Sequence, residues 1–114
     1  TVRAANGSNT MRTSYVMGWQ EDAVESTYSV IATGAAAGNS IIGIGVDVTN
    51  ALSGSKGYFA INGGTLLQSS FHSDTYLGFH YHQACEVGNT TTTFYGDNGN
   101  AALYQNMLKT RLRM

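Results

Sequence analysis

The chain has 114 residues and a net charge of −1, and Asp, Glu, Lys and Arg together make up only 11% of it. This length suits one domain spanning residues 1–114, with a core that needs no disulfide bonds, and the single cysteine excludes a disulfide scaffold. The net charge of −1 argues against sequence-independent nucleic-acid binding, which needs clustered Lys and Arg, and without a run of 18 apolar residues we expect no membrane insertion.

Period-two alternation of side chains predicts strands along most of the chain. The first strand is expected over residues 11–19, where apolar side chains recur at every second position. An acidic turn at 20–22 leads to a β-branched strand over 24–33. The small-residue segment 34–39 is expected to be a loop or an edge crossing rather than a helix, because glycines bracket it. A nearly continuous apolar strand over 41–48 follows.

Two Asn-Gly segments give the strongest turn signals in the second half of the chain. Asn-Gly supplies the two positive-φ positions of a type I′ hairpin, so the segment 62–64 (Asn-Gly-Gly) and the segment 97–100 (Asp-Asn-Gly-Asn) are predicted hairpin turns. Gly43 and Gly45 lie within the predicted apolar strand 41–48 and interrupt its apolar run. Such glycines indicate a bulge or the close approach of another backbone segment.

The last predicted strand carries the chain's basic cluster. Lys109, Arg111 and Arg113 occupy alternate positions, with Leu or Thr between them. This pattern predicts a solvent-exposed row of a strand, and the alternatives are a subunit contact or an anion site. Counting all predicted strands gives about eight, at a spacing typical of an all-β, antiparallel, jelly-roll-like β-sandwich.

His80, His82 and Glu86 allow two interpretations. Their order, His-x-His-x-x-x-Glu, resembles the first motif of the cupins, in which such side chains hold a divalent metal. The second cupin motif contains Pro and a further His, whereas this chain has no Pro and no His after His82. The alternative is an ordinary half-buried strand in which Phe79 and Tyr81 belong to the apolar row and the histidines to the opposite row. On that interpretation the protein needs no metal and no other cofactor.

Four segments carry a family resemblance: 19–22 (Trp-Gln-Glu-Asp), 43–47 (Gly-Ile-Gly-Val-Asp), 78–86 (Gly-Phe-His-Tyr-His-Gln-Ala-Cys-Glu) and 91–97 (Thr-Thr-Thr-Phe-Tyr-Gly-Asp). In order and spacing they resemble the carboxy-terminal domains of bacteriophage virion proteins, tail-fibre proteins and their prophage relatives. The resemblance implies a small β-sandwich, commonly trimeric, at a fibre tip or on the virion surface, as the carboxy-terminal domain of a longer protein. It also implies a second way in which His80 and His82 could bind a metal, because some phage fibre tips hold iron on a threefold axis through His-x-His motifs.

The function that this resemblance implies is non-enzymatic recognition of a host-surface receptor, either a glycan or an outer-membrane component. The expected partners are further copies of the chain in a homotrimer, other virion proteins, and a host-surface glycan or protein. Polar groups beside an aromatic ring on surface loops suit such recognition. The candidate binding residues with these properties are Tyr95, Asp97, Asn98, Asn100, Asn89 and Thr90.

Three other functions remain open. A capsid decoration or fibre-assembly domain would share the fold but present an apolar docking face. A cupin-like metal-binding protein would use the two histidines. An enzyme has the least support, because the chain contains only seven Asp and Glu residues and no Gly-x-Ser-x-Gly segment.

Overall fold

The computed structural model describes residues 2–5, 11–18, 24–53, 56–73, 77–88, 92–95 and 106–112. These ranges contain seven strands: β1 (Arg3–Ala4), β2 (Arg12–Met17), β3 (Val24–Val46), β4 (Lys56–Ser73), β5 (Gly78–Val87), β6 (Thr92–Tyr95) and β7 (Met107–Arg111). The described ranges contain no α-helix, and accordingly none of their elements is a helix with the length and apolar character needed to cross a membrane. Every pairing between strands is antiparallel.

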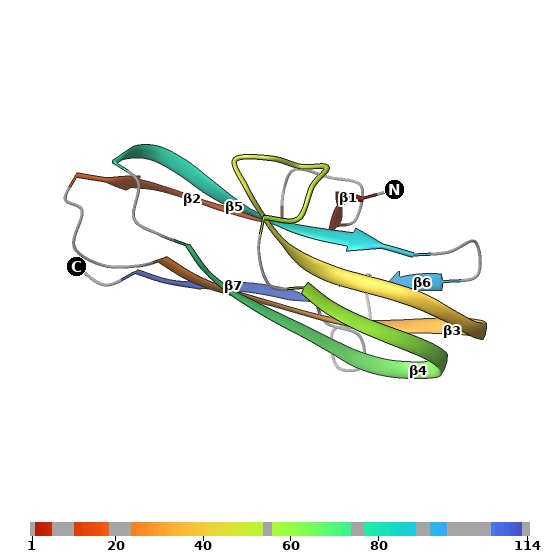
Figure 1. Ribbon diagram of the computed structural model, residues 1–114. Coiled ribbons are helices and arrows are strands. Elements are labelled where there is room, and N and C mark those ends of the chain that lie inside the picture. The colour runs from red at the N-terminus through yellow and green to blue at the C-terminus, as the bar shows by residue number, and fades with distance from the viewer. Residues whose placement is uncertain are drawn as a thin grey trace.

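The β3–β4 hairpin is the longest pair of strands described, and β5, β6 and β7 pair with its strand β3. Its two strands, of 23 and 18 residues, stay paired from Val24–Ser73 to Gly43–Lys56. Midway the register shifts, because Gly34 pairs with Gly63 but Gly38 pairs with Ile61, so that 35–37 lie opposite residue 62 alone. Extra residues on one strand bend a hairpin. In Figure 1 both strands accordingly run to one end of the molecule, bend there and return.

The bend divides the continuous seven-stranded sheet into two layers. The first half of β3 pairs with the second half of β4 and, along its other edge, with β6 and β7; we call this the β7 layer. The second half of β3 pairs with the first half of β4 and with β5, whose far edge holds β1 and β2; this is the β5 layer. The predicted all-β antiparallel sandwich is therefore confirmed.

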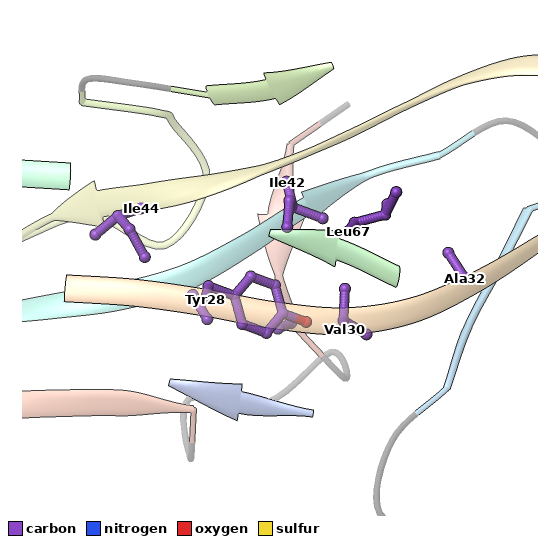
Figure 2. Close-up of a cluster of buried hydrophobic side chains, with 8 residues drawn as sticks. Tyr28, Val30, Ala32, Ile42, Ile44 and Leu67 are labelled. Carbon is purple, nitrogen blue, oxygen red and sulfur yellow. The ribbon is translucent and has the colours of Figure 1, made fainter. Parts of the chain in front are cut away.

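Strand β3 contributes buried side chains to the core from both layers. Tyr28, Val30 and Ala32 point inward from the first half of β3, while Ile42 and Ile44 point inward from the second half (Figure 2). All five side chains are fully buried. Burial of a large apolar side chain contributes about 1.5–3 kcal/mol, so residues 10 to 16 positions apart on one strand hold its two halves together.

The structure corrects two turn predictions. The segment 62–64 lies inside β4 and 34–39 lies inside β3, so neither is a turn or loop that ends a strand. The glycines in both segments instead lie at the bend, which uses the same backbone freedom that a tight turn would use. The connection of the hairpin is 47–55, and Asp47 ends β3 there with a φ of 58°. The predicted turn at 97–100 lies outside the described residues.

Gly45 is required by the way this connection returns over β3. The backbone NH of Ser53 donates to the carbonyl of Ile44 at 3.0 Å, and the Ser53 Oγ accepts from the backbone NH of Val46 at 2.8 Å. A Cβ at Gly45 would lie 2.6 Å from the carbonyl oxygen of Val48 and nearly as close to that of Ala51. The close approach that the glycine pattern indicated is therefore confirmed at this position.

We predict that Gly45→Ala lowers the free energy of unfolding by about 1–3 kcal/mol, because two backbone carbonyls must move to admit the methyl group. Gly18→Ala is the matched control, since an added Cβ there meets no described atom within 4 Å. It should change stability by less than about 0.5 kcal/mol. Urea unfolding followed by circular dichroism measures both variants, and equal stability of the two would contradict the packing argument.

Candidate functional site

A polar groove of about 330 Å³ lies on the outer face of the β7 layer. This volume is at the low end for small-molecule sites. Strands β3, β4 and β7 provide its walls. The lining residues are Glu25, Thr27, Ser29, Gln68, Met107, Lys109 and Arg111.

Strand register explains why these side chains meet. Even-numbered residues in the first half of β3 face the core, so the odd-numbered ones face outward. Glu25, Thr27 and Ser29 are three successive outward positions, and their direct partners on β7 are Arg111, Lys109 and Met107, respectively. Directly opposed residues of an antiparallel pair share a face. On the other side of β3, Ser29 pairs with Gln68 of β4.

The charges in the groove are unevenly distributed. Glu25 Oε1 lies 3.6 Å from His72 Nε2, whereas neither Lys109 nor Arg111 forms an ion pair with any described residue. Both cations are exposed, as the alternating pattern of the last strand predicted. Thr27 Oγ1 and the hydroxyl of Ser70 form a hydrogen bond of 2.9 Å. The groove thus combines two cations that form no ion pair with a described acid, the carboxylate of Glu25 and neutral hydrogen-bonding groups.

Tyr95 is the one predicted binding residue that the described ranges include. It pairs with Ile31, two positions beyond Ser29, so it lies on the same outer face as the groove. Thr33 Oγ1 donates to its hydroxyl at 3.5 Å. The other five predicted residues lie outside the described ranges: Asp97, Asn98, Asn100, Asn89 and Thr90.

The two strand residues that flank the predicted tip pair with β3 at positions two residues apart. Tyr95 is the last residue of β6 and pairs with Ile31, while Met107 is the first residue of β7 and pairs with Ser29. Tyr95 and Met107 therefore lie along the same edge of β3 in the β7 layer. The predicted tip at 97–100 itself lies outside the described residues.

His80 and Asp47 form a close pair at the start of β5. His80 Nδ1 lies 2.6 Å from Asp47 Oδ2, and its Nε2 lies 2.9 Å from the carbonyl oxygen of Leu77. Two acceptors favour the imidazolium, so the hydrogen bond to Asp47, and after it the one to Leu77, raises the pKa of His80. Burial alone would raise the pKa of Asp47, but the bonds from His80 and from the Tyr81 backbone NH lower it overall.

His82 is fully buried between the two layers. Its Nδ1 lies 2.6 Å from the hydroxyl of Ser26, which belongs to the β7 layer, and its Nε2 lies 3.3 Å from the hydroxyl of Tyr15 in β2. Ser26 Oγ also forms a 2.9 Å hydrogen bond with Thr110 Oγ1 of β7. Burial lowers the pKa of His82 from 6.5 to about 4. The imidazole is therefore neutral at pH 7 and links the layers by hydrogen bonds.

The three residues of the cupin-like pattern take separate partners. His80 pairs with Asp47 and His82 with Ser26, and Glu86 Oε1 lies 2.9 Å from the guanidinium of Arg3. Within the described residues, no group of three or more His, Cys, Asp or Glu is placed to hold a metal ion.

The row assignment predicted for this strand is reversed in the structure. Phe79, from the expected apolar row, is 64% exposed, whereas His82 and Ala84, from the opposite row, are fully buried. A neutral histidine with both nitrogens hydrogen-bonded is compatible with burial. Further along the strand, Cys85 of the outward row is also buried, and its Sγ lies 3.8 Å from the carbonyl oxygen of Thr49 in the connection that folds over it.

The comparisons with known proteins give no family assignment. No family model matches the sequence, and neither a curated protein nor a solved structure matches it. The site is therefore interpreted from its own chemistry.

Five groove residues were missed by the sequence reasoning, which singled out only Lys109 and Arg111. A signal for part of the groove exists in the first half of β3, where Glu25, Thr27 and Ser29 alternate with residues that include Tyr28. That alternation identifies an outward polar row. It does not identify β7 as the strand beside it, because strand pairing is a tertiary property.

We predict that acidification destabilises the protein through His82. Its pKa in the folded state, about 4, lies below the ordinary 6.5, so the unfolded chain binds more protons between these pH values. Stability should fall as the pH is lowered from about 6.5 to about 4, by on the order of 3 kcal/mol. Urea unfolding at a series of pH values measures this loss, and His82→Gln should remove most of the slope.

His80→Gln is the matched comparison, with the opposite sign. Because the folded-state pKa of His80 is raised, its contribution to stability is fully present below the unfolded value of 6.5 and is lost as the pH rises through the folded pKa. The His80 variant should therefore be less stable than the wild type. This difference should increase as the pH falls from the folded-state pKa of His80 to 6.5. A His82 variant that keeps the wild-type slope between pH 6.5 and 4 would contradict the assignment.

Proposed function

We propose that this chain is a non-enzymatic domain of a bacteriophage virion that binds a host-surface receptor, a glycan or an outer-membrane component. The observation that carries the binding role is the polar groove on the β7 layer, with Tyr95 of β6 on the same outer face. Surface loops on a rigid β-scaffold are common places for recognition. The virion location, at a tail-fibre tip or on the particle surface, rests on the sequence resemblance.

The chemistry of the groove supports binding of a hydroxyl-rich ligand. Thr27, Ser29 and Gln68 offer hydrogen-bond donors and acceptors. Tyr95 adds an aromatic side chain on the same face, where its ring can pack against a sugar ring. A surface built from such groups matches the low charge content of the whole chain.

The same residues favour binding over hydrolysis. Glycoside hydrolases usually act with a pair of carboxylates that flank the scissile bond. Glu25 is the single carboxylate among the groove residues that the structure describes. The described groove residues thus offer one carboxylate and not the pair that such hydrolysis uses.

We predict that the purified chain binds a restricted set of glycans on an array, and that the tip segment contributes to this binding. Replacing Asp97, Asn98 and Asn100 together with Ala, while keeping Gly99 for the turn, should weaken glycan binding and adsorption to host cells without loss of the β-sheet circular dichroism spectrum. Undiminished binding by the folded triple variant would place recognition outside the tip. Absence of any binding by the wild-type chain to glycans and to host outer membranes would contradict the receptor role.

A second candidate function, a decoration or fibre-assembly domain, is favoured by an apolar patch on the opposite side of the molecule. Val16 on β2 pairs directly with Phe79 on β5, and these side chains are 74% and 64% exposed. Leu77, just before β5, is also exposed. Exposed apolar side chains grouped in this way mark interaction surfaces. Further copies of the chain in a homotrimer, or other virion proteins, are the partners that we propose for this patch.

We predict a trimer of about 36 kDa, three times the chain mass of 12.1 kDa, in sedimentation at micromolar concentration. Phe79→Glu should shift the protein toward the monomer, because a charge would be buried in the apolar contact. Leu66→Glu is the control, since Leu66 is 61% exposed but lies on the outer face of the other layer. A wild-type monomer, or equal effects of the two variants, would contradict trimerisation through this patch.

A further inference from the structure

We infer that the groove on the β7 layer is a site for an acidic sugar, whose carboxylate lies against Lys109 and Arg111 and whose hydroxyls lie against Thr27, Ser29 and Gln68. This inference rests on the proposed receptor-binding function and specifies the ligand of that same site. It concerns the groove itself and not the tip segment.

The two cations are placed to act on one anionic group. Lys109 and Arg111 are two residues apart on β7, so they project from the same face of the strand. Both are exposed and neither is paired with a described acid. An arginine guanidinium can donate two parallel hydrogen bonds to a carboxylate, and lysine adds a point charge beside it. A neutral ligand would form no ion pair with Lys109 or Arg111.

The charged residues lie toward the Glu25 end of the groove. It pairs directly with Arg111, while the next pair along is Thr27 with Lys109 and the third is Ser29 with Met107. The groove is therefore charged at one end and neutral at the other. A ligand carboxylate would be repelled by Glu25 and attracted toward Lys109, and the Glu25 carboxylate remains able to accept a proton-donating hydroxyl of the same ligand.

The neutral end identifies the rest of the ligand as a sugar and not a simple anion. Ser29 and Gln68 provide a hydroxyl and an amide, both of which pair with hydroxyl groups. Met107 is 56% exposed beside them and offers apolar surface to the C–H face of a pyranose ring. Inorganic phosphate would use only the cations. The volume of about 330 Å³ suits a short oligosaccharide segment rather than a large ligand.

The test uses the full chain and three acidic probes: trigalacturonic acid, a hyaluronan tetrasaccharide and 3′-sialyllactose. Each is compared with its carboxyl methyl ester, which keeps the hydroxyls and removes the charge. Isothermal titration calorimetry at low salt measures the dissociation constants. At least one acid should bind roughly tenfold or more tightly than its ester, the effect of one charge-assisted hydrogen bond, and added salt should reduce this difference.

Variants separate the charged end from the neutral end. Lys109→Gln combined with Arg111→Gln should reduce binding of the acid to the level of its ester and leave ester binding unchanged. Gln68→Leu should weaken acid and ester by the same factor. Arg12→Gln is the control for a lost cation, because Arg12 lies over the Tyr81 ring, 3.9 Å from its centroid, in the β5 layer; it should leave the preference for the acid intact.

The remaining outcomes overturn the inference. Equal binding of acids and esters, an acid preference that survives loss of both groove cations, or full displacement by equimolar inorganic phosphate would each do so. If the chain still binds neutral glycans or host cells in those cases, the receptor-binding function stands and only the acidic ligand fails. If the chain binds none of the probes, no arrayed glycan and no host membrane, both proposals fail.

Discussion

The bend in the β3–β4 hairpin is the constraint on which the rest of the structure depends. Between Gly34 and Gly38 the pairing register of β3 against β4 shifts by two residues. A shift of one residue would turn every following side chain to the other face, whereas a shift of two keeps each on its own face. The same even-numbered row of β3 therefore faces the core before and after the bend, which is why Val30 and Ile42 meet inside the sandwich.

The bend also determines what the outer faces carry. Because β3 crosses from one layer to the other, its first half is free to pair with β6 and β7 while its second half pairs with β5. The polar groove and the exposed apolar patch consequently lie in different layers. This separation is compatible with the two roles that we propose, ligand recognition on the β7 layer and subunit contact on the β5 layer.

Polar groups also contribute to the connection between the layers. His82 comes from β5, and it contacts Ser26 by a hydrogen bond and the ring of Phe71 at a centroid distance of 5.9 Å, both in the β7 layer. A buried imidazole needs partners for both ring nitrogens; Tyr15, on the neighbouring strand β2, lies at Nε2, and Ser26, from the other layer, lies at Nδ1. The hydrogen bond between His82 and Ser26 therefore adds a directional contact between the layers to the packing of the apolar core.

The sequence by itself determined the fold class and several outward rows. Period-two alternation is a local property of the chain, so it identified the strands that became β2 and both halves of β3, and it placed Lys109 and Arg111 on the exposed side of β7.

Tertiary structure decided what local patterns leave ambiguous. Asn-Gly suits a hairpin turn and equally a bend within paired strands, and the pairing of β3 with β4 along both halves selected the bend. Buried His82 is hydrogen-bonded to Ser26, which lies 56 residues away in the chain. The groove likewise needed β7 beside β3, because Thr27 and Lys109 become neighbours only through strand pairing. Spacing along the chain gives the face on which a side chain lies, but only register between distant strands gives its neighbours.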